Sequence, residues 1–209
     1  AQPGIGELAI EAPGFQTYRH GHHHEFELIA LPEPVETLLG TCFCVACLAR
    51  AKAAGLGGDA LARQARRDLE AFFADGAAPV LNPQTDPDWK ALQACRADTV
   101  TSLIAEVRAA LDPVVRLAAI PSVQTPNALC WREGGDLAAL AKVADRLEVP
   151  AYQTGPAAIA QDMDQVRAAA GADADIGFIL RPTWPHVTGP DDLAACVASA
   201  RAAGAAQLS

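Results

Sequence analysis

Apolar runs of strand length recur at nearly constant intervals along the second half of this chain. Runs that begin at Arg116, Leu147, Ile176 and Ala205 are separated by 31, 29 and 29 residues. This is the length of one strand, one helix and two short loops. The repeat predicts a parallel sheet, because parallel neighbours need a crossover connection, which a helix normally supplies. Residues 8–10 form a further apolar run and predict a fifth strand.

Helical periodicity fills the intervals between these runs. Apolar stripes at helical spacing cover residues 100–111, 137–144, 159–166 and 193–200. Pro190, followed by two aspartates, is typical of a helix start, and Asp136 is expected to be an N-cap.

The pattern predicts an α/β fold, and we expect part of a (β/α)8 TIM barrel with about five units visible. Residues 1–209 would form one barrel-type domain that lacks sequence at both ends. An open five-stranded parallel sheet is the alternative.

One interval is far longer than the others. The chain runs 107 residues from Ile10 to Leu117, so residues 13–90 are predicted to be an insertion rich in cysteine and histidine. We expect it to contain a long helical segment over residues 45–73 and a proline-rich connector over residues 77–88.

Composition excludes two classes of partner. The net charge is −9 and the basic residues are scattered, so no nucleic-acid partner is expected. Hydrophobic residues make up 51%, but no run approaches the roughly 20 apolar residues that span a membrane, so we expect a soluble protein.

Six cysteines are too few for a disulfide scaffold at this length, which favours a reducing, cytoplasmic compartment.

Three of the six cysteines stand together as Cys42, Cys44 and Cys47. This C-x-C-x-x-C spacing can close around one soft metal ion, and a helix expected to begin near Val45 would favour the thiolate form. We predict a structural zinc site. The fourth ligand could be Cys95, Cys130, a histidine or a residue outside this sequence, and the alternative is three free core thiols.

A histidine-rich block, His20-Gly21-His22-His23-His24-Glu25, precedes the cysteines. In an extended segment His22 and His24 point to the same side, so both could meet a metal or a substrate while Glu25 orients a ring. A solvated loop is the alternative.

Polar side chains follow the predicted strands. They are Glu11 after the first, Ser122 and Gln124 after the second, Tyr152 and Gln153 after the third, and Arg181, Trp184 and His186 after the fourth. Because the carboxyl ends of parallel strands share one edge, we expect these groups to line one rim. Aromatic faces and amides there would suit a carbohydrate or another small polar ligand. Ordinary loop residues are the alternative.

Glu11 is the candidate catalytic residue. A carboxylate that ends an apolar strand would be partly desolvated, which raises its pKa and suits a general acid. A glycosidase needs a second carboxylate, and no other predicted strand ends in one.

The run Leu38-Leu39-Gly40-Thr41-Cys42-Phe43-Cys44-Val45-Ala46-Cys47 resembles a segment of bacterial glycoside-hydrolase-like TIM-barrel proteins, including family 42 β-galactosidases. In that family such cysteines help bind a structural zinc, and a glutamate ending the fourth strand is the acid/base. The resemblance implies that Glu11 is its counterpart. A closer likeness is to uncharacterised barrel proteins with similar histidine and Ile120-Pro-Ser-Val-Gln124 stretches.

The chain also departs from this family. Ile10 precedes Glu11 where the family has an asparagine, and the nucleophilic glutamate would fall near Arg181, where there is none. Our first hypothesis is a glycoside-hydrolase-like barrel that acts on or binds carbohydrate. The alternatives are a non-catalytic sugar-binding or structural barrel that has lost the nucleophile, and a metal-dependent enzyme that uses the histidine block.

Overall fold

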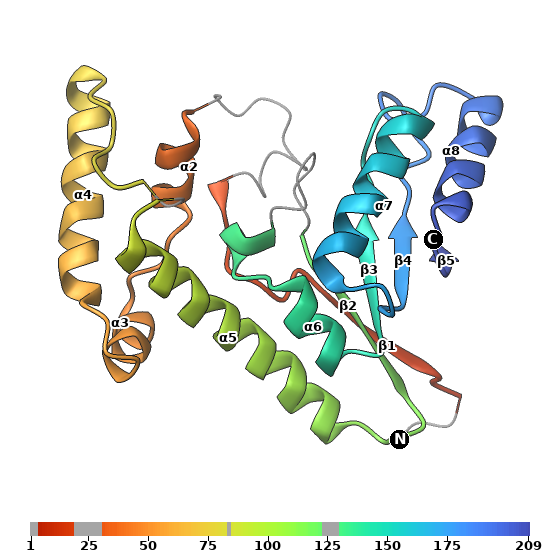
Figure 1. The fold of residues 1–209 in the computed structure, drawn as a ribbon, viewed down its shortest axis with the longest axis horizontal. Helices are drawn as coiled ribbons and strands as arrows, with labels where there is room; N and C mark the ends of the chain where they lie inside the picture. Colours follow the sequence, from red (N-terminus) through yellow and green to blue (C-terminus); the bar gives the residue numbers. More distant parts are fainter. Residues whose placement is uncertain (1–3, 19–30, 83–84, 123–129) are drawn as a thin grey trace. The chain divides into compact units, whose positions relative to one another are not determined.

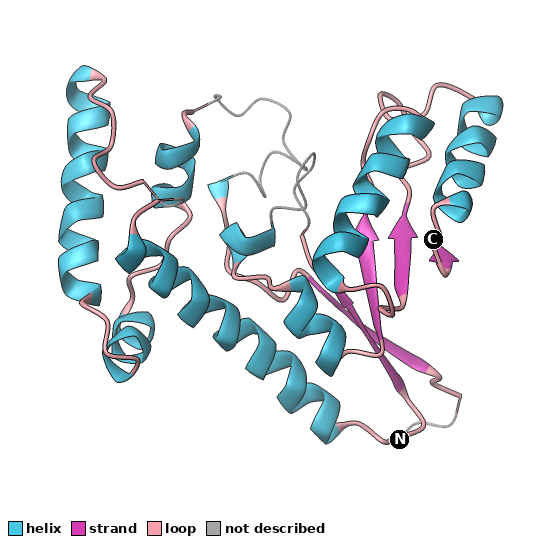
Figure 2. Ribbon diagram, viewed as in Figure 1, coloured by secondary structure: helices cyan, strands magenta, loops and turns pink. Residues whose placement is uncertain are grey.

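The computed structural model describes residues 4–18, 31–82, 85–122 and 130–209. Within these ranges it contains five strands, seven α-helices and one short 3₁₀ helix, η1 (Cys130–Glu133) (Figure 1, Figure 2). None of the described helices is long and apolar enough to cross a membrane. The chain forms two compact units. Unit 1 contains Ala1–Gly14, Val100–Cys130 and Gly135–Ser209, and unit 2 contains Phe15–Thr99 and Trp131–Gly134.

A five-stranded parallel sheet is the centre of unit 1. Its strands are β1 (Glu7–Glu11), β2 (Arg116–Ile120), β3 (Arg146–Pro150), β4 (Ile176–Ile179) and β5 (Gln207–Leu208). They lie side by side in chain order, and each neighbouring pair is parallel. The predicted strands and their parallel arrangement are therefore confirmed. The described residues form an open five-stranded sheet with β1 and β5 at its edges, which is the alternative that the sequence offers. The expected (β/α)8 barrel is not confirmed, because five strands are too few to close one.

The helices of unit 1 form a layer on the sheet. They are α6 (Leu137–Val143), α7 (Pro156–Ala170) and α8 (Pro190–Ala202), together with the last part of α5 (Pro87–Ala110). Helix α7 packs against both α6 and α8, and Figure 1 shows α6 and α7 in front of the strands. The core contains Leu147 and Phe178 from the sheet with Met163 and Cys196 from the helices, all at most 1% exposed.

Helix starts in unit 1 follow the expected capping chemistry. Asp136 accepts a hydrogen bond of 3.0 Å from the Ala139 backbone N–H, which confirms it as the N-cap of α6. Helix α8 begins at Pro190 with two aspartates in its first turn, as the sequence predicts.

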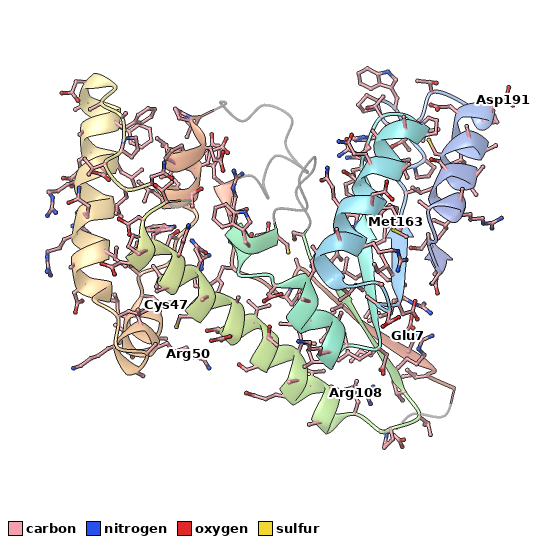
Figure 3. The ribbon with its side chains drawn as sticks, viewed as in Figure 1. Glu7, Cys47, Arg50, Arg108, Met163 and Asp191 are labelled. Atoms are coloured by element: carbon pink, nitrogen blue, oxygen red, sulfur yellow. The ribbon has the colours of Figure 1, made fainter. Side chains whose placement is uncertain are left out.

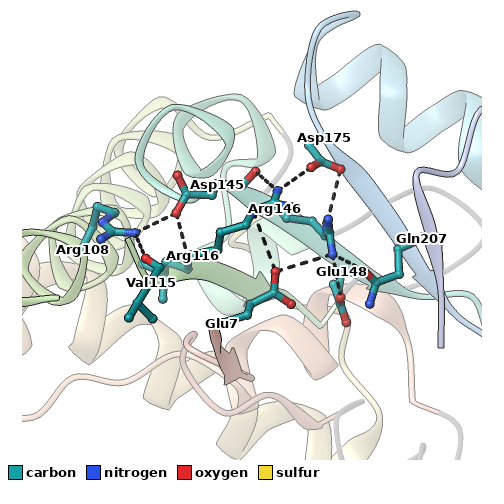
Figure 4. Close-up of polar contacts among 10 residues, drawn as sticks. Glu7, Arg108, Val115, Arg116, Asp145, Arg146, Glu148, Asp175 and Gln207 are labelled. Carbon is teal, nitrogen blue, oxygen red and sulfur yellow. Dashed lines mark hydrogen bonds and ion pairs between the residues drawn. The ribbon is translucent and has the colours of Figure 1, made fainter. Parts of the chain in front are cut away.

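Charged side chains gather at the amino ends of the strands (Figure 4). Arg146, at the start of β3, lies 3.5 Å from a Glu7 carboxylate oxygen, 3.7 Å from Glu148 and 3.3 Å from Asp175. Its side chain is only 10% exposed, and it also donates a hydrogen bond to Gln207. Because catalytic groups in parallel α/β folds collect at the opposite edge, we assign this network to stability.

Unit 2 contains α2 (Glu33–Leu39), α3 (Val45–Ala53), α4 (Gly58–Asp75) and the first part of α5. The expected single helix over residues 45–73 is wrong, because the chain turns at Gly55, whose φ of +77° suits glycine, and α4 begins at Gly58. A Cβ at Gly58 would lie 3.1 Å from the Ala51 Cβ, so the glycine lets α3 and α4 approach closely.

The core of unit 2 is separate from that of unit 1. It consists of Leu38, Ala51, Leu61, Ala65, Leu81, Trp89 and Leu92, with Phe43, Leu56 and Leu69 packed against them. The buried carboxylate of Asp68 accepts hydrogen bonds from the Leu81 backbone (2.9 Å) and the Gln64 amide (2.7 Å). Most of the predicted insertion, from residue 15 onward, belongs to this unit.

Candidate metal centre and polar rim

The three clustered cysteines lie at the start of α3 in unit 2. Cys44 is the N-cap residue of this helix and Cys47 lies in its first turn, where Figure 3 labels it. Phe43, between the first two cysteines, makes an edge-on contact with Trp89 at 6.2 Å between ring centroids. Because Trp89 is fully buried, this contact anchors the cysteine segment to the core of unit 2.

The sulfur atoms of Cys42, Cys44 and Cys47 all lie within 4.8 Å of one another. Sulfurs bound to one zinc ion are about 3.8 Å apart, because each Zn–S bond is about 2.3 Å and the geometry is tetrahedral. Small side-chain rotations would therefore bring the three sulfurs onto one ion. Cys44 is exposed and the other two are half-buried, so an ion could reach the group from solvent.

The thiols of this group ionise unequally. The backbone N–H of Cys47, the neighbouring thiols and the backbone N–H of Ala46 lower the pKa of Cys44 to about 7. No side-chain hydrogen bond of normal geometry caps α3, so the amides act as nearby dipoles. Burial is the main cause that raises the pKa of Cys47 to about 12, and the neighbouring Cys42 and Cys44 side chains raise it further. One thiolate forms easily, whereas several need a compensating positive charge.

Arg96, in the first part of α5, supplies one such charge from within unit 2. It is 4% exposed and donates hydrogen bonds to the Gly40 carbonyl (3.2 Å), the Thr41 hydroxyl (3.2 Å) and the Arg132 carbonyl (3.1 Å). Burial lowers the pKa of Arg96 to about 10, while the charges of Cys47, Cys42 and Glu133 act in the opposite direction. The guanidinium is thus close enough to the sulfurs to stabilise their thiolate forms.

The described residues supply three ligands and no fourth. No other cysteine, histidine or carboxylate in the described ranges joins the group, so Cys95 and Cys130 are not its fourth ligand there. His22 and His24 lie outside the described residues, and their metal or substrate role stays a prediction.

A second polar group follows β3 and β4 in unit 1. The Arg181 guanidinium lies 5.9 Å from the ring centroid of Tyr152, and the rings of Tyr152 and His186 are 6.2 Å apart. Trp184 is 80% exposed. The structure thus brings Tyr152, Arg181 and His186 together, as the shared edge of a parallel sheet predicts. We call Tyr152, Arg181, Trp184 and His186 the polar rim.

Two side chains near the polar rim carry shifted pKa values. Burial raises the pKa of Asp162, on α7, to about 6, although a hydrogen bond with Gln153 opposes the shift. Burial is the main cause that lowers the pKa of His186, and the positive charge of Arg181 lowers it further. The Tyr152 backbone acts in the opposite direction. Neither His186 ring nitrogen makes a hydrogen bond of normal geometry with any described residue. The lowered pKa favours the neutral imidazole of His186, and the raised pKa makes Asp162 easier to protonate than an exposed aspartate.

Glu11 ends β1, where the sequence places it, but its side chain is exposed. The expected desolvation is absent because β1 is an edge of the described sheet. No hydrogen bond or ion pair in the described part of the chain joins its carboxylate to the polar rim. Glu148 is on the same face of the sheet by strand register, but it faces Arg146 at 3.7 Å. Gln124 lies outside the described residues, so its role stays a prediction.

Comparison of the chain with protein families, curated proteins and solved structures finds no match. The likeness to glycoside hydrolases therefore stays a prediction. The sequence interpretation missed Arg96 and Asp162. Arg96 lies far along the chain from the cysteines, and the burial that shifts the pKa of Asp162 comes from helix packing, so neither is marked by a local sequence signal.

Proposed function

We propose that Cys42, Cys44 and Cys47 hold a zinc ion that stabilises unit 2. The observation that carries this proposal is the mutual approach of three sulfurs within 4.8 Å. Thiolates select soft or borderline ions, and a zinc site built from cysteines at a helix start is commonly structural. Three thiolates and Zn²⁺ carry a net charge of −1, which the nearby Arg96 guanidinium offsets.

Purified chain loaded with zinc is expected to retain one ion per molecule, measured by elemental analysis after gel filtration. Cys44→Ser and Cys47→Ser should each lower this ratio well below one, because two thiolates bind zinc weakly. Zinc removal with a chelator should lower the melting temperature. A ligand that binds only the folded chain, at a free concentration a thousand times its Kd, stabilises the fold by about 4 kcal/mol. Cys95→Ser, outside the group, is the matched control, and zinc retained by all three variants would exclude the site.

We further propose that unit 1 belongs to a barrel-type arrangement. Its strands lie in chain order, and its connecting helices pack side by side in one layer. Doubly wound sheets reverse their strand order to place helices on both faces, whereas consecutive order is that of successive units in a (β/α)8 barrel. This topology supports the expected scaffold.

A second candidate function is carbohydrate binding at the polar rim, with Glu11 as a proton donor if turnover occurs. It is favoured by an exposed indole, Trp184, three residues beyond Arg181, whose guanidinium lies 5.9 Å from the ring centroid of Tyr152. Aromatic faces that stack on sugar rings and polar groups that pair with hydroxyls are the usual parts of such sites. A role for Glu11 in catalysis requires that Glu11→Gln abolish any hydrolysis of aryl glycosides.

Sugar binding is measured by isothermal titration calorimetry with a panel of oligosaccharides, because this signal does not depend on Trp184 as a reporter. Trp184→Ala should weaken binding at least tenfold, because it removes the stacking face, whereas Trp184→Phe should retain part of the affinity. Phe73→Ala is the control, since Phe73 is an exposed aromatic side chain of unit 2. Equal affinity in the native chain and in Trp184→Ala would rule out this rim.

A further inference from the structure

The cysteine group has the geometry of a dithiol as well as that of a metal site. Cys44 is the N-cap of α3 with extended backbone angles (φ −67°, ψ 168°), and Cys47 follows three residues later in the first turn. An N-cap side chain with these angles turns toward the third helical residue. Residues three apart at a helix start have Cα atoms about 5 Å apart, which is within the range of a disulfide. All six cysteines are free in the structure.

The three sulfurs differ in their access to solvent. Cys44 is exposed, whereas Cys42 and Cys47 are half-buried. A dissolved oxidant therefore meets Cys44 first, with Cys47 positioned to react next. The Cys42 sulfur also lies within 4.8 Å of the other two, so peptide mapping has to distinguish a Cys44–Cys47 linkage from one to Cys42.

We propose that this group is an oxidation site at which a hydroperoxide converts Cys44 and Cys47 to a disulfide and so ejects the zinc ion. The Cys44 thiolate attacks hydrogen peroxide, the O–O bond breaks, and a sulfenic acid and one hydroxide form. The Cys47 thiolate then attacks the Cys44 sulfur, the S–O bond breaks, and a disulfide and a second hydroxide form. Two sulfurs lose one electron each, and the peroxide gains both.

The step removes two of the three proposed ligands at once. Cys42 alone cannot retain the ion, because a single thiolate does not form a closed zinc site. Zinc release and disulfide formation should therefore occur in a ratio of one to one. This inference rests on the proposed zinc site for the release step, whereas the pairing of Cys44 with Cys47 rests only on the backbone of α3.

The test uses the full chain loaded with zinc and treated with hydrogen peroxide. Zinc release is followed with a chromogenic chelator, free thiols are titrated, and the disulfide is located by peptide mass spectrometry. We expect one zinc released per chain, a fall from six free thiols to four, and a Cys44–Cys47 linkage. Dithiothreitol and fresh zinc should restore the starting state.

Two variants define the assignment. Cys95→Ser should release zinc like the native chain. Metal-free Cys47→Ser should form no such disulfide and should accumulate a Cys44 sulfenic acid that dimedone traps. A linkage to Cys42 or Cys95, or thiol loss with zinc retained, overturns the proposal. A chain that takes up no zinc overturns the metal site and the release step together, and mapping on the metal-free chain then still decides the pairing.

Discussion

Arg96→Met is expected to destabilise unit 2 by about 3 kcal/mol or more. The variant keeps most of the aliphatic bulk but removes a guanidinium that is 4% exposed and donates to the Gly40 and Arg132 carbonyls. Both carbonyls lose their hydrogen-bond partner, and each buried acceptor without a partner lowers the stability by about 1 to 3 kcal/mol. The guanidinium also lies 4.5 Å from the Phe15 ring centroid, a contact that the variant loses. Urea unfolding followed by tryptophan fluorescence measures the change, since Trp89 is buried in this unit.

The same variant should also weaken zinc binding, on the order of tenfold, because a positive charge near the thiolates disappears. Arg63→Ala, an exposed arginine of α4, is the control and should change stability by no more than about 0.5 kcal/mol. Unchanged zinc affinity in a folded Arg96→Met chain would show that Arg96 supports the fold without influencing the cysteines.

The sequence predicts the sheet well because its strands are marked by local signals. Buried parallel strands such as β3 and β4 are short apolar runs, and the crossover helices between them have amphipathic stripes and recognisable starts at Asp136 and Pro190. Regular spacing then fixes the parallel arrangement. Closure into a barrel is a property of strand number and stagger, which the visible runs do not specify.

The candidate sites were only partly predictable. The C-x-C-x-x-C spacing is local, so the approach of three sulfurs could be expected before the fold was known. The position of Arg96, 49 residues beyond Cys47, depends on how the helices of unit 2 pack. Glu11 shows the opposite error, because an apolar run predicted burial that an edge strand does not provide. Residues joined only by packing are those that sequence patterns miss.

Arg146→Met is expected to destabilise unit 1 by about 3 to 5 kcal/mol, because it removes the cation shared by three carboxylates (Figure 4). Glu148 is the critical partner, since its side chain is only 10% exposed and its buried charge is left uncompensated. Urea unfolding followed by circular dichroism measures the loss. Arg116→Met is the matched control. Its pair with Asp175 is shorter, at 2.7 Å, but Arg116 is 45% exposed, so we expect about 1 kcal/mol or less.

The pH dependence separates loss of charge pairing from loss of packing. Burial alone would raise the pKa of Asp175, but Arg116 and Arg146 outweigh it and hold this pKa below its usual value of 3.8. A depressed carboxyl pKa stabilises the fold above the unfolded value, and this stabilisation is lost as the pH falls through the folded value. Arg146→Met removes part of this stabilisation at neutral pH. The free energies of unfolding of the variant and of the native chain should therefore converge below about pH 4. A gap between the two chains that stays constant from pH 7 to pH 3 would mean that Arg146 acts through packing of its aliphatic stem.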